Sequence, residues 1–278
     1  MLNLGKYKIL RVSKNLKISR QSIYKNKTKV VCMKNYVKKE DTFLLSIIKN
    51  ILENRPTYGY KRVTAMVNNV IQENHGKVNK KRIYRIMKNN GLLLPKTEVQ
   101  RKEHTGTGKI ITLHSNTRWC SYGFEIRCFN DEKVYVAFSL DCRDREAISY
   151  VASKEPLLGK NIQDLMIHSV EKRFNNLKTQ RQIEWLSDRG SIYRDKSVQN
   201  LARNLGLKPC YTAAYSPSSN GMAEAFVGTF KRDYVYVNDC YSADWVLEHL
   251  EEWFYDYNHH APHSGLAMMS PIQYQNSH

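Results

Sequence analysis

The chain has 278 residues, 41% of them hydrophobic, and carries a formal net charge of +18. Two domains with a real core fit this length. No apolar run is long enough to span a membrane, no signal-peptide core is apparent, and six scattered cysteines without a CxxC pair fit inert thiols in a reducing cytosol. These features argue against a membrane protein and a disulfide framework, and we expect a cytoplasmic protein.

The positive charge is concentrated in the first part of the chain. Residues 1–110 hold 26 Lys and Arg against 6 Asp and Glu, a net of +20, whereas residues 111–278 have a net charge of −2. A field of this sign recruits polyanions, and release of counterions makes such binding sensitive to salt. We therefore expect association with DNA. The plainer alternative is a basic surface that only confers solubility.

Residues 1–40 contain twelve Lys and Arg and a single acid. The segment 16–24 fits the turn and second helix of a small helix-turn-helix, with Ser19 as its N-cap and Arg20, Gln21 and Lys25 towards DNA. A disordered basic arm is the alternative, because the apolar residues here are few.

Residues 41–94 have the pattern of three helices, and with residues 1–40 they form the expected basic helical DNA-binding region, 1–94. Asp41 can begin the first helix, and the second follows Pro56. The third, over 78–88, has an apolar face and a basic face, and its basic side chains are candidates for DNA contact, as is Arg62 in the second. The alternative is a solvated basic face. The basic residues of the third helix are Lys80, Lys81, Arg82, Arg85 and Lys88.

A polar segment, 95–111, follows as the expected linker, and the expected core is 112–278. Apolar alternation predicts an antiparallel meander of three strands near 116–126, 134–141 and 147–152. Helical spacing then runs from Ile162 to Val170. A short strand over 183–187, a helix over 196–205, a strand over 209–213 and a helix over 223–235 complete a mixed α/β order.

Two acids in this core are placed to hold a metal. Asp188 follows the strand 183–187, and Glu224 lies on the helix 223–235, after Ser and Asn residues that are candidate caps. A carboxylate at a strand end and one on a following helix can converge on one divalent cation. Hard Mg²⁺ or Mn²⁺ prefers such oxygen ligands, and two metals about 3.5–4 Å apart are the usual means of cutting and joining phosphodiesters.

These acids lie in a motif that resembles a known family. Asp188-Arg189-Gly190-Ser191, followed after thirty-five residues by Glu224 within SPSSNGMAEAF, is similar to the DDE transposases of bacterial insertion sequences, which have a retroviral-integrase-like core. PTYGYKRV (56–63) and KRIYRIMKNNGLL (81–93) also have close counterparts there. The resemblance implies a ribonuclease-H-like mixed five-stranded sheet with flanking helices, preceded by an all-α helix-turn-helix region.

The resemblance also exposes departures. Where related transposases have Trp-Cys-Ser-Asp-Gly-Phe-Glu, this chain has Tyr122 in place of the first acid of the metal-binding triad. A phenol is neutral near pH 7 and is a poor ligand for Mg²⁺. Of the nearby acids, Glu125 points to the opposite face of the strand, and Asp141 and Asp144 belong to a turn. Arg189 stands where the family usually has Asn, and Ala267-Met268 stand where it commonly has Gly-Tyr.

The family implies further roles. Lys231, two helical turns after Glu224, corresponds to a basic residue that contacts the DNA end. The alternative is a solvated lysine. No covalent protein–DNA intermediate forms in this chemistry, so Tyr122 is not expected to act as in a tyrosine recombinase. Three histidines near 260 are expected to pack rather than to bind metal. Gly190 and Gly221 are expected to serve backbone conformation.

The sequence thus predicts a transposase for DNA transposition whose metal pair, held by Asp188 and Glu224, is incomplete and whose catalysis is impaired. The alternative is an inactive relic that only binds DNA. A nuclease unrelated to transposition is disfavoured by the basic helical region. Expected partners are transposon ends and target DNA, a second copy of the chain, and an upstream-frame protein joined by frameshifting.

Overall fold

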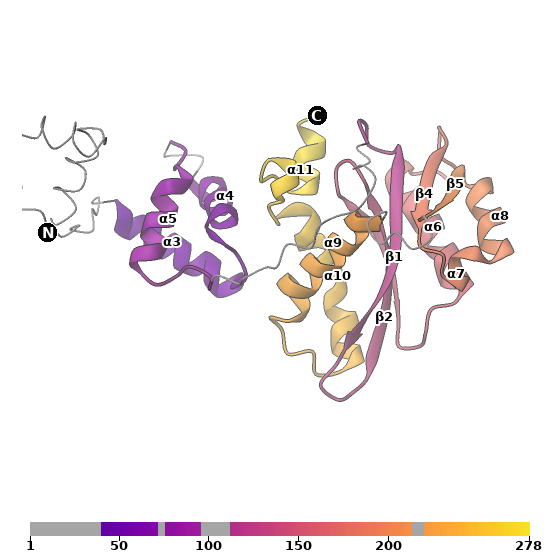
Figure 1. The fold of residues 1–278 in the computed structure, drawn as a ribbon, viewed down its shortest axis with the longest axis horizontal. Coiled ribbons are helices and arrows are strands. Elements are labelled where there is room, and N and C mark those ends of the chain that lie inside the picture. Colours follow the sequence, from indigo (N-terminus) through magenta and orange to yellow (C-terminus); the bar gives the residue numbers. More distant parts are fainter. Residues whose placement is uncertain (1–39, 72–75, 96–111, 213–219) are drawn as a thin grey trace, which may run out of the picture. The chain divides into compact units, whose positions relative to one another are not determined.

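The structure is a computed structural model that describes residues 40–71, 76–95, 112–212 and 220–278 (Figure 1). The expected helix-turn-helix at 16–24 lies outside these residues. The chain divides after Leu44 into two compact units, the second of which is Leu45–His278. Within the described residues, every helix is too short or too polar to cross a bilayer. The expected boundaries at 94/95 and 111/112 stay a prediction.

Three helices lie in the described part of the helical region: α3 (Asp41–Asn54), α4 (Tyr60–Ile71) and α5 (Lys80–Asn89). Asn79 begins α5 by accepting a hydrogen bond from the Lys81 amide at 2.9 Å. Gly91 ends it in the left-handed conformation, at φ +68°. The apolar faces bury their side chains completely or nearly so, and this burial holds the helices together; the buried residues include Ile48, Val63, Val67, Ile83, Ile86 and Met87.

The core is built on a mixed five-stranded sheet in the order β3-β2-β1-β4-β5 (Figure 1). The strands are β1 (Arg118–Arg127), β2 (Lys133–Asp141), β3 (Ala147–Ser153), β4 (Ile183–Ser187) and β5 (Leu207–Tyr211). β1, β2 and β3 form the expected antiparallel meander, whereas β4 runs parallel to β1 and β5 runs parallel to β4.

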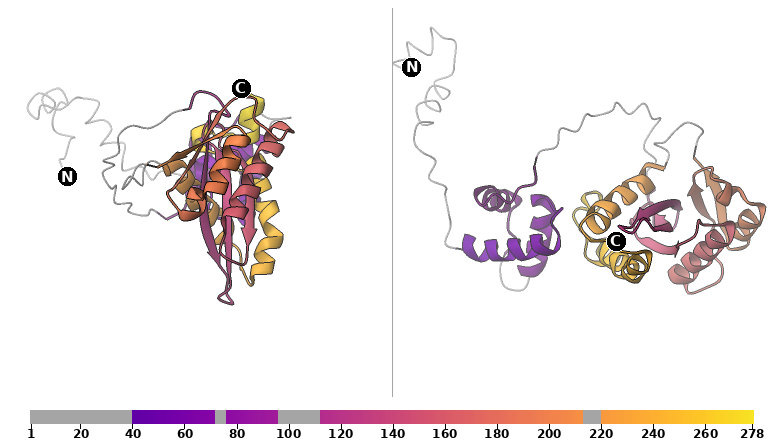
Figure 2. Two further views of the ribbon diagram at one scale, coloured as in Figure 1. Left: turned by 90° about the vertical axis from the view of Figure 1, so that its right-hand side faces the viewer. Right: turned by 90° about the horizontal axis from the view of Figure 1, so that it is seen from below.

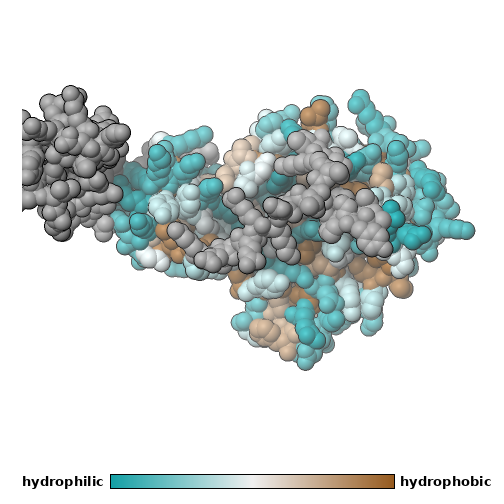
Figure 3. Space-filling model, in the orientation of Figure 1, coloured by the Kyte–Doolittle hydropathy of each residue, from teal (hydrophilic) through white to brown (hydrophobic). Residues whose placement is uncertain are grey.

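Helices cover both faces of this sheet. α6 (Gly159–Phe174) and α8 (Lys196–Asn204) pack on one face, and α9 (Gly221–Phe230) and α10 (Ala243–His259) pack on the other, as Figure 2 shows. Each face has its own apolar core, and aromatic rings dominate the α9/α10 side. Hydrophilic residues prevail on the face seen in Figure 3, with hydrophobic residues in small groups over the core. The expected fold class is therefore confirmed.

Some elements differ from the expectation. The helix predicted over 223–235 is two elements, α9 and a π-helical turn η2 (Lys231–Val235). The sequence reasoning did not predict α7 (Ser191–Arg194), α10, the short η3 (Ser264–Leu266) or α11 (Pro271–Asn276). Aromatic and β-branched residues have only modest helix propensity, so tertiary packing decides α10.

Candidate active site and DNA-contact residues

Tyr122 lies on β1, and Asp188 directly follows the neighbouring strand β4. β1 and β4 pair in parallel as far as Cys120 opposite Leu186, so each of the two residues lies two positions beyond this last pair. Cys120 and Leu186 contribute to the apolar core on the α9 side, and so does Tyr122, which is half-buried against it. Since side chains alternate along a strand, Tyr122 belongs to the sheet face that α9 covers.

The Asp188 carboxylate is held by the turn that follows β4. Its Oδ1 accepts a hydrogen bond from the Gly190 amide at 2.9 Å. Gly190 has φ −55°, so its backbone alone does not require glycine. A Cβ at this position would lie 2.9 Å from Asp188 Oδ1, so a side chain here would make the Asp188 carboxylate shift. The φ of Gly190 does not require the expected role in backbone conformation.

Glu224 lies in the first turn of α9 and is exposed. The helix is fixed from below by Ala223, Phe226 and Phe230, which are buried in the aromatic core, with the Phe226 ring 4.2 Å from that of Phe138. Glu224 and Lys231 lie on the helix face next to the buried face that these three residues form. The expected capping by Ser or Asn is not found for Asn220, whose side chain makes no cap hydrogen bond.

Asn220 instead connects α9 to the strand of Tyr122. It is 4% exposed, and its Nδ2 donates a long hydrogen bond of 3.5 Å to the carbonyl of Ser121. The Ser121 hydroxyl in turn lies 3.0 Å from the buried Tyr193 hydroxyl of α7. Burial raises the pKa of Tyr193, and the negative charge of Asp188 adds to this rise. The sequence reasoning missed both residues, because an Asn before a helix is typically a cap.

The neighbouring acids do not replace the missing one. Glu125 is exposed and pairs with Lys133 at 3.0 Å across the β1–β2 hairpin, so it faces away as expected. Among the residues that the structure describes, no group of three or more His, Cys, Asp and Glu side chains is placed to hold a metal ion. The candidate metal-ligating groups are therefore the carboxylates of Asp188 and Glu224 and the phenol of Tyr122.

Asp141 is a structural residue, as its expected place in a turn implied. It is fully buried at the end of β2 and accepts backbone hydrogen bonds from Arg143 at 2.7 Å and Asn116 at 2.6 Å. Burial and the nearby Asp144 raise the pKa of Asp141 to about 6. Asp144 is also fully buried and accepts a hydrogen bond from Arg173 at 2.5 Å. These acids hold together the start of β1, the β2–β3 turn and the end of α6.

Lys231 begins the π-helical turn after α9 and is partly exposed. Its ammonium lies 5.6 Å from the centre of the Phe124 ring, and it forms no ion pair with any residue that the structure describes. A π-helical turn is rare and occurs often at functional sites. The position suits a DNA contact, which stays a prediction.

The basic residues of α5 differ in exposure. Lys80 and Lys81 are exposed at its first turn, whereas Arg82 and Arg85 are partly buried. Arg62 of α4 is 15% exposed in its side chain, donates to Asp233 at 2.7 Å and lies 3.5 Å over the Tyr58 ring. The structure thus gives Arg62 a protein partner, and its contact with DNA also stays a prediction.

Of the three histidines near 260, His263 packs in the interior as expected, whereas His259 is partly exposed and His260 is exposed. His263 is buried against the Tyr257 ring, with ring centres 4.6 Å apart. Burial and the charges of Arg62 and Arg145 lower its pKa to about 4. His259 and His260 lie beside the Tyr255 ring, and no metal-binding group includes any of the three among the described residues.

Comparisons with known proteins agree with this geometry. Two protein-family models, both described as integrase core domain, match residues 113–217 and 205–271. A third family model, described as HTH-like domain, matches residues 38–100. A solved simian T-cell lymphotropic virus intasome, in complex with the PP2A regulatory subunit B56 gamma, superposes with a TM-score of 0.51 at 14% identity over 84% of this chain and 75% of that one. The fold and its acids define a protein with an integrase-like, ribonuclease-H-like core.

The relatives narrow this class. Transposase InsD for insertion element IS2D of Escherichia coli K12 is 41% identical over 237 residues, which cover 84% of this chain and 79% of the relative. Transposase InsD for insertion element IS2-9 of the same strain is 41% identical over 84% of this chain and 77% of that protein. The chain belongs to the integrase-core transposases of bacterial insertion elements, a family that acts on DNA.

Proteins of this family use divalent metal ions, and the residues present fit such ions only in part. Asp188 already accepts an amide hydrogen bond, Glu224 is exposed, and the neighbouring strand β1 carries the ring of Tyr122. Without a third acid among the described residues, this set does not fit a metal pair, which needs an acid that both ions share.

Proposed function

We propose that this chain is a DNA-binding transposase whose strand cleavage and strand transfer are impaired because Tyr122 replaces the first metal-binding acid. The observation that supports this proposal most is that Tyr122 lies on the face under α9, two residues beyond the last β1–β4 pair, while Asp188 follows that pair by two residues on the β4 side. A neutral phenol in that position supplies no negative charge, and its ring fills space next to the carboxylate.

The remaining site residues have separate roles in this proposal. Asp188 and Glu224 are the ligands that would hold Mg²⁺ or Mn²⁺, which when bound would supply Lewis-acid activation for phosphodiester chemistry. Gly190 keeps space free for the Asp188 carboxylate, and Asn220 positions the start of α9 against β1. These residues of the chain would still orient a DNA strand beside the site.

DNA binding is carried by other parts of the protein. Lys80 and Lys81, exposed on α5, and Lys231 after α9 are proposed to contact phosphates, together with Arg82, Arg85 and Arg62. The net charge of +20 in residues 1–110 supports salt-sensitive binding. We further propose that the chain acts in the cytoplasm as a homo-oligomer on transposon ends and target DNA, and that an upstream-frame protein can be fused to it.

The second candidate function is a DNA-binding protein without catalysis, either a relic or a competitor for transposon ends. Tyr122 favours it, because an enzyme that lacks one of its metal ligands keeps its DNA-binding surface. The two candidates differ only in residual chemistry at the site, so an activity measurement separates them.

The test is a strand-transfer assay with labelled DNA ends in Mg²⁺ and in Mn²⁺. We expect little or no product from the unmodified chain and a gain of at least about 100-fold for Tyr122→Asp, since a missing metal ligand removes several kcal/mol of transition-state stabilisation.

Tyr122→Asn is the matched control, because it removes the ring without adding a carboxylate, and it is expected to stay inactive. Robust activity of the unmodified chain, equal to that of Tyr122→Asp, would contradict the impairment. Activity in neither protein, with DNA binding intact, would favour the second candidate.

A further inference from the structure

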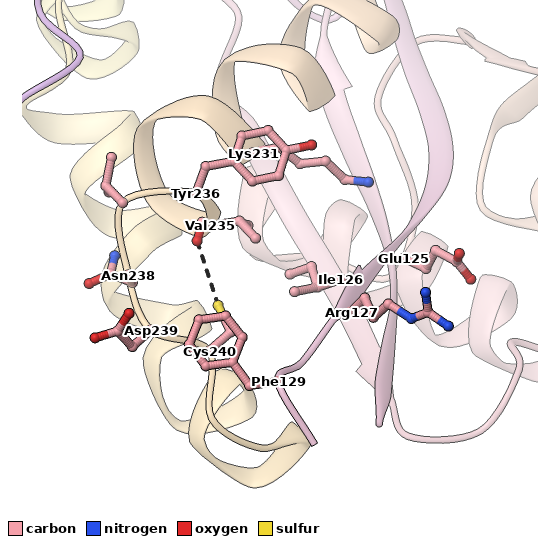
Figure 4. A pocket seen from close by; sticks show the side chains of 11 residues that line it. Glu125, Ile126, Arg127, Phe129, Lys231, Val235, Tyr236, Asn238, Asp239 and Cys240 are labelled. Carbon is pink, nitrogen blue, oxygen red and sulfur yellow. Dashed lines mark hydrogen bonds between the residues drawn. The ribbon is translucent and has the colours of Figure 1, made fainter. Parts of the chain in front are cut away.

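A pocket with an aromatic rim lies beside the π-helical turn, away from Asp188. Its volume is about 440 Å³, within the roughly 300–1,000 Å³ typical of small-ligand pockets. It is lined by the end of β1 and by the segment that joins η2 to α10; the lining includes Ile126, Phe129, Lys231, Val235, Tyr236 and Cys240 (Figure 4).

The rim exposes large rings to solvent. Tyr236 is 74% exposed, Phe129 is 70% exposed, and Tyr241 beside it is 58% exposed. The rings of Phe129 and Tyr241 meet edge to face with centres 6.1 Å apart, which holds the Phe129 ring in place. Such a group of exposed aromatic side chains costs solubility and is typical of a binding surface.

The floor of the pocket is apolar and fixed. Ile126, Val235 and Cys240 are buried, and the Cys240 thiol donates to the Val235 carbonyl at 3.7 Å. Figure 4 shows Val235 and Ile126 between Tyr236 and Phe129, so a flat ligand entering between these two rings would rest on aliphatic side chains. The shape and chemistry suit a planar, weakly polar group.

The charges at the mouth select the ligand further. Glu125 pairs with Lys133 at 3.0 Å, and Asp239 accepts a hydrogen bond from the Tyr241 hydroxyl at 3.2 Å. Arg127 lies 3.7 Å from Asp131. Lys231 has no such partner among the described residues, and together with the exposed Arg127 it supplies the lining with positive charge for an anion.

We propose that this pocket binds an unpaired nucleobase of a DNA strand, stacked against Tyr236 and Phe129, with the adjoining phosphate on Lys231. Aromatic rings on which bases stack, together with positive charge for the backbone, are the features that bind single-stranded nucleic acid. The inference rests on the proposed DNA binding and extends it, because it assigns the chain a preference for DNA with frayed or single-stranded ends.

The experiment compares two labelled probes by fluorescence anisotropy with the full chain. One is a blunt duplex, and the other is the same duplex with a short unpaired 3′ tail that carries 2-aminopurine. We expect the tailed duplex to bind more tightly than the blunt duplex. Tyr236→Ala and Phe129→Ala should each weaken binding of the tailed duplex by roughly tenfold without changing affinity for the blunt duplex. The 2-aminopurine emission should be quenched on binding and restored in both variants.

Tyr236→Phe keeps the ring and should behave like the unmodified chain. Tyr255→Ala removes a ring of similar exposure, 55%, on α10 and is the matched control. Equal affinity of the two probes, or a tail preference that both alanine variants retain, would overturn the inference while leaving the proposed function standing. Failure to bind either probe would contradict the proposed function itself.

The same patch can also serve contact between two copies of the chain. Sedimentation of the unmodified protein and of Tyr236→Ala at one concentration distinguishes the two uses. An unchanged sedimentation coefficient with lost tail binding supports the nucleobase site. A shift to a smaller species, with tail binding lost only in proportion to that shift, would overturn it.

Discussion

At the scale of single residues, substitutions relative to the family fall where the backbone or the chemistry is demanding. Tyr122 replaces an acid, and Ala267 replaces a residue that is commonly glycine. Ala267 has φ +54° and ψ +32°, the left-handed region, and Met268 follows at φ +67°. A side chain in this region costs about 1 kcal/mol relative to glycine. We therefore expect this change to bear on stability.

Ala267→Gly is therefore expected to raise the free energy of unfolding by about 0.5 kcal/mol, because relief of the strain outweighs the extra freedom of glycine in the unfolded chain. Urea unfolding measures it. Ala225→Gly, in the exposed middle of α9, is the control and should lose about 1 kcal/mol. A loss of stability at both positions would show that residue 267 does not need glycine.

Individual residues also set the limit of the sequence reasoning. The motif around Asp188 and Glu224 could be found because spacing and flanking residues agree together. The close approach that explains Gly190, and the contact of Asn220 with Ser121, depend on distances across the fold. No local pattern encodes such distances, so these roles had to come from the structure.

At the scale of elements, strands were easier to predict than the helices that pack on them. The strands are short apolar runs and so were found near their expected positions, although burial alternates regularly only along β4, and β2 is buried on both faces from Val136 to Asp141. α10 carries seven buried residues yet was not predicted, because its apolar and polar residues mix with aromatic ones of modest helix propensity. The π-helical turn was also missed, because it continues the helical pattern without interruption.

The turn between β2 and β3 gives a test at this scale, through Asp141. The pKa of Asp141 is about 6 in the folded chain, above the ordinary value near 3.9, so its ionised form lowers stability. The protonated form of Asp141 therefore stabilises the fold in full below about pH 4, and this stabilisation is lost as the pH rises through 6.

Relative to Asp141→Asn, which does not titrate, the unmodified chain should gain about 2–3 kcal/mol of unfolding free energy between pH 7.5 and pH 4. Urea unfolding of both proteins across this range measures the gain. A difference between the two proteins that stays constant with pH would show that Asp141 is not destabilised by its burial.

At the scale of the whole molecule, most of the positive charge and the candidate metal-binding acids belong to different parts of the chain. The positive charge lies in residues 1–110, and the acids lie in a core whose residues 111–278 are almost neutral, with a net charge of −2. We therefore expect Tyr122 to affect chemistry more than it affects DNA binding. Composition and charge indicated where the basic residues gather. The expectation of an incomplete metal site depended on the single residue Tyr122.

The most direct measurement is Mn²⁺ binding by the full chain, followed by the electron paramagnetic resonance signal of free Mn²⁺, beside DNA affinity on the same samples. Tyr122→Asp should bind Mn²⁺ at least about tenfold more tightly than the unmodified chain, lose the gain when Asp188→Asn is added, and bind DNA equally well. Mn²⁺ binding by the unmodified chain as tight as that of Tyr122→Asp would contradict the account.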